Sequence, residues 1–328
     1  MFIQGGNLKY DKAYSELFEE FLTIYEVREL NFDEESYYDS DSDRFFCPDE
    51  LCRSEQKQKS VLTTVNAKKI VYKKTPHFKD IPSTQHRKAC PYLSDGSNHV
   101  NIETNSSHAE GVKETDFPTE FILERKKYTK KKKTGEIKET QSKSNEIIKT
   151  NSENKIEKNT NKKSPNRTSV FEHIVECYFS NSNDKELLKT MPLTIGGLKI
   201  NYNFFFKQIL YFQDREGLIY WGKVKKITDY KYSFSITFEK KVSGKSISAY
   251  INKNTVESYR KKNYFLDFIR NVIEQKEEVN CFFLGAYPVL KTITTQKKDN
   301  TGKIEKIEFE VFNIEIINLD HFLLRSIK

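Results

Sequence analysis

The sequence predicts an α+β protein with a small zinc-stapled N-terminal module, a disordered linker and a C-terminal β-rich domain. Three observations predict this organisation. Cysteine and histidine residues gather in the first third of the chain, a lysine-rich polar stretch follows, and apolar residues alternate strictly in the last third. Of the 328 residues, 36% are apolar and 31% are charged, so part of the chain is expected to lie outside any core. The predicted boundaries are 1–104, 105–168 and 169–328.

The N-terminal module is expected to begin with an amphipathic helix over Asp11–Leu30. Leu17, Phe21 and Ile24 fall near one apolar stripe with helical spacing, although the end of this segment is rich in residues that favour strands. Farther along, apolar residues of Ser60–Lys74 alternate with polar ones around a turn. This pattern predicts a pair of strands.

Two pairs of potential metal ligands flank these strands. Cys47 and Cys52 are separated by four residues, and His86 and Cys90 by three. Such spacings allow both members of a pair to reach one ion from a turn. Three thiolates and one imidazole favour tetrahedral Zn²⁺, and a structural role is preferred over a catalytic one. His77 is an alternative to His86 as a ligand, or a hydrogen-bond partner of the ligands.

This stretch resembles the N-terminal zinc-binding region of CoiA-like competence proteins, over about residues 20–95. The residues that carry the resemblance are Phe45-Phe46-Cys47-Pro48, Cys52, Thr75-Pro76-His77-Phe78-Lys79, His86 and Cys90. The usual cysteine pair of that family is closer together, and a second histidine commonly stands where this chain has Asp80. Family members often continue into a nuclease-like domain of the restriction-enzyme type, which the residues after 95 do not visibly do.

Residues 105–168 are expected to form a disordered linker. They are rich in Lys, Glu, Asn, Thr and Ser, and a segment of low hydrophobicity and abundant charge cannot offset the entropy of an ordered chain. A small apolar group around Phe121 is compatible with a short element over Phe117–Arg125. The most basic point, Lys126–Lys133, is a candidate contact for polyanions.

The C-terminal domain is expected to begin with a short helix over Val170–Phe179 and to continue mainly as strands. Alternate residues from Tyr232 to Phe238 are apolar, which predicts a strand with those side chains on one buried face. The other predicted elements are strands over Leu218–Thr228 and Ser246–Ile251, a helix over Val256–Gln275, and strands over Val279–Leu290 and Ile304–Leu319.

Three strands, one helix and two strands therefore follow one another. This β-β-β-α-β-β order is that of the five-stranded OB barrel, in which the helix lies between the third and fourth strands. Gly222 and Gly285 lie inside predicted strands, where such barrels need bends. The sequence thus predicts an OB-like barrel, with a generic α+β domain as the alternative.

No convincing catalytic site is visible, because phosphate-loop, Rossmann and nucleophile-elbow motifs are absent. The best enzymatic candidate is Asp229 with Glu239 and Lys241. An acidic residue, a hairpin and then Glu-x-Lys is the arrangement of restriction-type nucleases, in which the carboxylates hold a divalent cation and the lysine helps to position the attacking water. A solvent-facing strand end explains the same residues more simply.

The preferred function is binding of nucleic acid, DNA or RNA, without sequence specificity and with single strands as the expected ligand. The formal charge is +8, and single-strand binders combine lysines that follow the backbone with aromatic rings that stack on bases. The residues with this interleaved pattern are Trp221, Lys223, Lys225, Tyr230 and Lys231. A protein-interaction adaptor that docks an unidentified protein through its zinc module is the first alternative. A metal-dependent nuclease is the second.

The expected location is the cytoplasm, with no membrane association. The first ten residues lack a signal-peptide pattern, and no apolar run reaches the roughly 18 residues that a transmembrane helix needs. Five cysteines, three of them in the candidate metal site, are not typical of a secreted disulfide scaffold.

Overall fold

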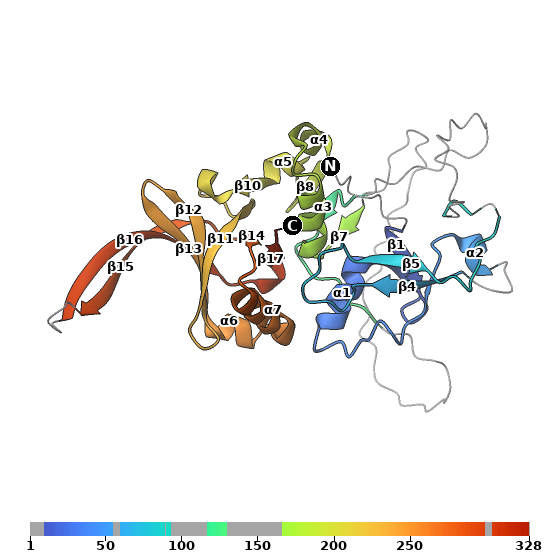
Figure 1. Ribbon diagram of the computed structural model, residues 1–328. Helices are drawn as coiled ribbons and strands as arrows, with labels where there is room; N and C mark the ends of the chain where they lie inside the picture. The colour runs from blue at the N-terminus through green and yellow to red at the C-terminus, as the bar shows by residue number, and fades with distance from the viewer. Residues whose placement is uncertain are drawn as a thin grey trace, which may run out of the picture.

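The computed structural model describes residues 10–54, 60–88, 90–92, 117–129, 166–298 and 304–327. Within these residues the protein is a mixed α/β structure made mostly of sheets, with a five-stranded, a four-stranded and an eight-stranded sheet (Figure 1). The predicted mixture of helices and sheets is confirmed at this level. Among the helices of the described ranges, none has the length and hydrophobicity that a membrane crossing requires.

The five-stranded sheet belongs to the N-terminal module. It consists of β1 (Lys12–Ser15), β2 (Glu20–Thr23), β3 (Phe45–Phe46), β4 (Val61–Val65) and β5 (His77–Asp80), paired antiparallel in the order β2-β1-β3-β4-β5. Two short helices, α1 (Ile24–Phe32) and α2 (Glu50–Ser54), accompany it.

The helix predicted over Asp11–Leu30 is wrong in its first half, which forms the β1–β2 hairpin instead. Only the end of that segment is helical, because Thr23 and Glu26 form a capping box that starts α1 at Ile24. The strand pair predicted within Ser60–Lys74 is also displaced. Only β4 lies there, and its partner β5 follows a longer connection.

The four-stranded sheet joins the described part of the predicted linker to the C-terminal domain. Its strands are β7 (Arg167–Thr168), β6 (Glu120–Phe121), β8 (Pro192–Ile195) and β9 (Leu198–Asn201), in that order. The short element expected around Phe117–Arg125 is thus β6, and its Phe121 is buried in the C-terminal core. Most of 105–168 lies outside the described residues.

The eight-stranded sheet is the centre of the C-terminal domain. Its strands are β10 (Phe206–Gln208), β11 (Ile219–Asp229), β12 (Phe234–Val242), β13 (Lys245–Ile251), β14 (Val279–Leu284), β15 (Val289–Lys298), β16 (Ile304–Ile316) and β17 (Phe322–Ser326). The order is β15-β16-β13-β12-β11-β14-β17, with β10 beside β11. The helices of this domain are α3 (Phe171–Ser180), α4 (Lys185–Thr190), α5 (Tyr202–Phe205), α6 (Lys253–Glu257) and α7 (Lys262–Gln275).

The predicted succession of strand, helix and strand in this domain is therefore present, but the barrel is not closed. Among the described residues β15 and β17 are the two edges of the sheet, and no ladder joins them. The strand predicted over Val279–Leu290 is divided into β14 and β15 at Gly285, whose φ of +88° is a backbone conformation that favours glycine.

The core of this domain lies between the inner face of the sheet and α7. Phe234, Ile236 and Phe238 of β12 are buried as predicted, and the buried face of α7 includes Phe265 and Phe268. Tyr232, predicted on the same buried face, is instead exposed. It lies in the turn before β12, because the strand begins only at Phe234.

The N-terminal module is joined to the C-terminal domain through a fully buried arginine, Arg28 of α1. Its Nε lies 3.1 Å from a carboxylate oxygen of Glu172 on α3. Its Nη1 donates to three backbone carbonyls at 2.9–3.1 Å, those of Asn66, Ala67 and Lys69. One guanidinium therefore ties together the helix α1, the β4–β5 connection and the first helix of the C-terminal domain.

A second group of charges at the same junction comes from the start of α7. Arg260 forms ion pairs with Glu29, Asp33 and Asp320, and the Lys261 ammonium lies 2.7 Å from Glu29. Buried ion pairs contribute less net stability than their number implies, but removing one partner is strongly destabilising. We expect the two parts of the protein to be firmly attached.

Candidate metal centre

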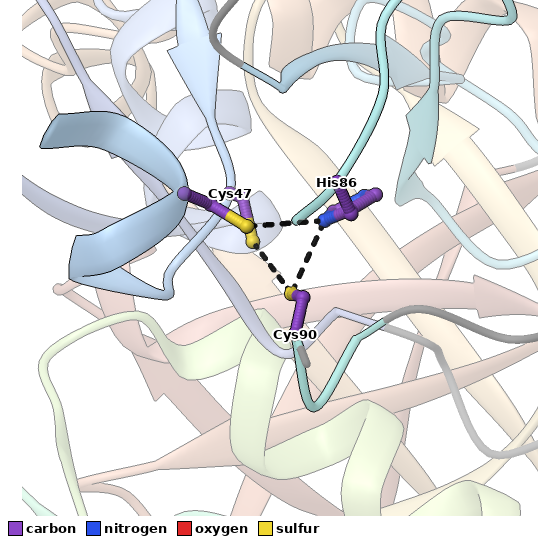
Figure 2. Close-up of side chains that lie close together, drawn as sticks. Cys47, His86 and Cys90 are labelled. Carbon is purple, nitrogen blue, oxygen red and sulfur yellow. Dashed lines mark hydrogen bonds between the residues drawn. The ribbon is translucent and has the colours of Figure 1, made fainter. Parts of the chain in front are cut away.

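Four side chains predicted as metal ligands lie together at one end of the N-terminal sheet. Cys47 directly follows β3, Cys52 is on α2, and His86 and Cys90 lie in the loop after β5. One potential ligand atom of each lies within 4.8 Å of all the others. Figure 2 shows Cys47, His86 and Cys90 pointing toward one another.

Two of the separations between these atoms are those of a tetrahedral site, and a third is shorter. The Sγ atoms of Cys47 and Cys90 are 3.7 Å apart, and the Nδ1 atom of His86 lies 3.7 Å from Cys52 Sγ and 3.2 Å from Cys90 Sγ. Zinc bonds of about 2.3 Å to sulfur and 2.0–2.1 Å to nitrogen place tetrahedral ligand atoms roughly 3.6–3.8 Å apart. A disulfide requires sulfur atoms about 2.05 Å apart, so this separation does not fit a Cys47–Cys90 disulfide.

Burial disfavours the thiolate form of Cys47 and Cys52, and a nearby cation would stabilise it. Burial raises the pKa of the Cys52 thiol to about 11 and raises that of Cys47 further, with the neighbouring thiols adding to both effects. Backbone N–H groups of Arg87 and Tyr92 lie 3.4 Å from the Sγ atoms of Cys52 and Cys90 and orient them. The buried cluster is therefore suited to a bound metal ion, whose charge compensates the sulfur atoms.

The other ring nitrogen of His86 has its own polar partners. Its Nε2 lies 2.9 Å from Asp80 Oδ1, 2.9 Å from the Tyr10 hydroxyl and 3.0 Å from Ser60 Oγ. Tyr10 also donates a hydrogen bond to Asp80. Because Nε2–H can donate to Asp80, the lone pair of Nδ1 is free to face the cysteines, and this carboxylate–histidine pair is typical of metal-binding histidines.

A second ion pair holds the cysteine-bearing loops together. The Arg87 Nε lies 2.6 Å from Asp49 Oδ2, which links the residue after His86 to the turn between Cys47 and Cys52. Burial would raise the pKa of Asp49, but the hydrogen bonds from Arg87 and Cys52 lower it overall. This pair is expected to hold both loops in position around the four ligands.

The alternative ligand His77 lies on β5 outside the cluster. Its Nδ1 is 2.9 Å from the carbonyl oxygen of Thr75 in the same segment. The structure thus selects His86, which the sequence left open. The sequence did not reveal Tyr10, Ser60 and Asp80 as partners of His86.

The nuclease candidates are not brought together. Asp229 at the end of β11 pairs with Phe234, five residues before Glu239 on β12. At about 3.3 Å per residue, the two carboxylates lie roughly 16 Å apart along the strand. Glu239 instead faces Lys223, with 3.7 Å between the charged atoms. Asp229, Glu239 and Lys241 therefore do not form one cation site.

The predicted nucleic-acid residues have different environments. Trp221 is partly buried and stacks on Phe282, with 6.0 Å between ring centroids, and its indole N–H is buried. Trp221 therefore packs against the core, and its predicted role in stacking on bases is not supported. Lys223 is paired with Glu278 at 3.0 Å. Lys225, Tyr230 and Lys231 are exposed.

Comparisons with known proteins identify no relative. No family model matches the chain, and neither curated proteins nor solved structures give a significant match.

Proposed function

We propose that Cys47, Cys52, His86 and Cys90 bind one structural Zn²⁺ ion. Four ligands leave no open position for a substrate or an activated water, which is the property that separates structural from catalytic zinc sites. The convergence of four ligand atoms within 4.8 Å of one another, with two separations of 3.7 Å, supports this proposal most directly. A reducing compartment such as the cytoplasm suits three unpaired thiols, and the resemblance to CoiA-like proteins stays a prediction that rests on the same residues.

Elemental analysis of the purified full chain tests the metal proposal. We expect about one zinc per chain, and loss of that zinc in Cys47→Ser and Cys90→Ser. Cys177→Ser is the matched control, because Cys177 lies on α3 outside the cluster. Zinc content that is absent from the wild type, or equal in all three variants, would contradict the assignment.

We infer further that the eight-stranded sheet is an open form of the OB arrangement. The antiparallel meander β11–β12–β13 continues to β16 through a parallel pair, while β11 pairs antiparallel with β14. A five-stranded Greek-key barrel has these neighbours if β14 and β15 are two halves of its fourth strand. They follow one another in the chain, separated only by residues 285–288.

We propose that this domain binds single-stranded nucleic acid through the outer face of β11–β13. The observation that carries the proposal is a group of exposed tyrosines at one end of this face, beside lysines without an acidic partner. Tyr230, Tyr232 and Tyr250 are 37–58% exposed. Tyr230 and Tyr232 lie in the β11–β12 turn, and Tyr250 pairs across strands with Ser235, next to that turn.

The charges on this surface fit a phosphate backbone. Among the described residues no acidic side chain forms an ion pair with Lys225, Lys226 or Lys231, and Lys226 shares the outer face with Thr237 by strand register. Lys253 lies 5.9 Å from the ring of Tyr232. Aromatic rings and unpaired lysines are the two components that non-specific single-strand binders combine.

The backbone of the β11–β12 turn adds support. Its central residues, Lys231 and Tyr232, have φ values of +59° and +81°, and the N–H of Tyr230 donates to the carbonyl of Ser233 at 2.8 Å. Such two-residue turns normally use Asn-Gly or Gly, because bulky residues are strained there. Strain of this kind concentrates at functional sites, and here it displays a lysine and a tyrosine at the tip.

Fluorescence anisotropy with labelled oligo-dT and oligo-U at two salt concentrations tests this proposal on the full chain. We expect binding that weakens steeply with salt, and a loss of roughly 5–150-fold in Tyr230→Ala or Tyr250→Ala if each ring stacks on one base. Tyr211→Ala is the matched control, since Tyr211 is an exposed tyrosine in the short 3-10 turn Ile209–Tyr211, before β11. No binding at low salt would refute the proposal.

A protein-interaction adaptor is the second candidate function. It is favoured by Phe21 and Leu51, which are exposed apolar side chains on the N-terminal module. Binding to a protein partner would depend weakly on salt and would require these residues, whereas the nucleic-acid proposal requires the tyrosines of the C-terminal domain.

A further inference from the structure

The strands β15 and β16 form a long two-stranded ribbon that extends away from the rest of the molecule (Figure 1). Its register fixes which side chains share a face. Leu290 is opposite Phe312 and points to the core side, because Ile314 and Ile316 on the same face of β16 are buried. The other face of the ribbon is therefore the outer face, which continues the face that carries Tyr250.

This continuity follows from the pairing of β13 with β16. Tyr250 is opposite Glu315, and Ser248 is opposite Asn313. Asn313 is in turn opposite Val289 on β15. The outer face thus runs from the exposed tyrosines, past Glu315 and across small polar side chains, to the ribbon.

The outer face of the ribbon is apolar and basic. Phe309 is 44% exposed and stands directly opposite Ile293, which is also exposed, and Lys291 lies between Val289 and Ile293 on the same face. From Asn313 to Phe309, the described side chains of this face include no carboxylate. The acidic side chains Glu308 and Glu310 fall on the opposite face, together with Lys306.

We propose that the outer face of the ribbon is the second half of the nucleic-acid site, in which Phe309 stacks on a base and Lys291 contacts a phosphate. This rests on the single-strand binding proposed above and names the path of the ligand. The bound nucleic-acid strand runs from the tyrosines at the β11–β12 turn, over β13, to the ribbon. A polyanion with stacked bases is the occupant that matches an exposed ring beside a lysine on the stretch of this face from Asn313 to Phe309, which carries no carboxylate.

The path sets a minimum length for the ligand. Glu315, which is opposite Tyr250, and Phe309 are six positions apart on β16, and this corresponds to roughly 20 Å along the strand. A site of that span, extended to the turn, falls within the range of about 4–16 nucleotides that one OB domain covers. Short oligonucleotides will therefore occupy the tyrosine end without reaching Phe309.

The simplest alternative is that Phe309 and Ile293 only stabilise the ribbon, since an aromatic ring opposite a β-branched residue contributes about 0.2–1 kcal/mol. The substitution Phe309→Leu separates the two explanations, because it keeps an apolar partner for Ile293 and removes the ring. Leu290→Ala and Lys306→Gln are matched controls, because both residues are exposed on the opposite face of the ribbon.

The experiment measures anisotropy of oligo-dT of about 4 and about 12 nucleotides with the full chain, together with the melting temperature of each variant. We expect Phe309→Leu and Lys291→Gln to weaken binding of the longer oligonucleotide by about 5-fold or more, to leave the shorter one unchanged, and to melt like the wild type. We expect the two control substitutions to bind both lengths like the wild type.

Three results would overturn the inference. Wild-type affinity of Phe309→Leu and Lys291→Gln for the longer oligonucleotide, with weakened binding by Tyr250→Ala, would remove the ribbon from the site and leave the proposed function intact. Equal losses in the control variants would show a general effect of ribbon stability. Failure of the wild type to bind either length would remove both proposals together.

Discussion

Replacement of Arg28 by Met tests whether the N-terminal module and the C-terminal domain unfold as one unit. The fully buried guanidinium pairs with Glu172 and donates to three backbone carbonyls, so its removal leaves one carboxylate and three acceptors without their partner. Breaking a buried ion pair by removing one partner costs about 3–5 kcal/mol. We expect Arg28→Met to lower the free energy of unfolding by that amount.

Urea denaturation followed by tryptophan fluorescence is the appropriate assay. Trp221 is the single tryptophan of the chain and packs in the C-terminal core, whereas Arg28 belongs to the N-terminal module. A shift of the Trp221 transition therefore reports coupling between the two parts. Circular dichroism recorded on the same samples reports both parts and should show a coincident transition.

Two further variants complete the design. Arg270→Met removes an exposed pair with Asp267 and should cost less than about 1 kcal/mol. The double variant Arg28→Met/Glu172→Met leaves no uncompensated carboxylate and should be less destabilised than Arg28→Met alone. If Arg28→Met stays within about 1 kcal/mol of the wild type, or leaves the Trp221 transition in place, the reasoning about the junction is refuted.

Three other predictions follow from single residues. Asp80→Ala should weaken zinc binding by about 10–100-fold in a competition titration with a chelator. Asp80→Asn should lose less zinc affinity, because its side chain still accepts a hydrogen bond from His86. Equal zinc affinity in the wild type and both variants would contradict the role of Asp80. Gly222→Ala should lower stability by about 1–3 kcal/mol in urea, since its new Cβ would lie 2.7 Å from the Ile209 side chain, whereas Gly217→Ala, with open space, should be nearly neutral. Burial alone would raise the pKa of Glu29, but Lys261 and Arg260 lower it to about 2. The ionised Glu29 therefore contributes its full stabilisation above the ordinary pKa of 4.5, and this contribution is lost as the pH falls toward 2. The stability difference between wild type and Glu29→Gln should accordingly narrow over that pH range, and a constant difference would be evidence against the ion pairs.

The parts of the fold that the sequence predicted correctly are those in which apolar residues repeat with a single period, that of a strand or that of a helix. The apolar alternation of β12 and the apolar stripe of α7 both reflect burial on one side, and both elements are present. The hairpin β1–β2 was mistaken for a helix because Leu17, Phe21 and Ile24 have helical spacing by coincidence. The Thr23–Glu26 capping box would have marked the true start of α1.

The candidate site could be predicted only as far as its ligands. Cysteine and histidine pairs have recognisable spacing, so Cys47, Cys52, His86 and Cys90 were accessible from the sequence. Their polar supports, Tyr10 before β1 and Asp80 on β5, are distant in the chain and have no sequence signature. Trp221 was misassigned for a related reason. Strand alternation gives the side of a sheet that a residue occupies, but not whether a helix such as α3 covers that side, and Tyr178 of α3 lies beside its ring.

The metal centre and the junction share one strand pair, and this leads to a last prediction. Strands β4 and β5 lie beside the four ligands, and their connection supplies the carbonyls of Asn66, Ala67 and Lys69 that hold Arg28. The same connection carries Tyr72, whose hydroxyl donates to Glu172 on α3 at 2.8 Å. With Zn²⁺ bound as proposed, loss of the ion should loosen this connection and thereby weaken the junction, because metal binding and folding are thermodynamically linked. Removal of zinc by a chelator should therefore move the Trp221 transition to lower urea concentration, and the shift should be smaller in Arg28→Met, where the junction is already broken. A chelator that removes the zinc but leaves the Trp221 transition unchanged would show that the metal stabilises only its own loops.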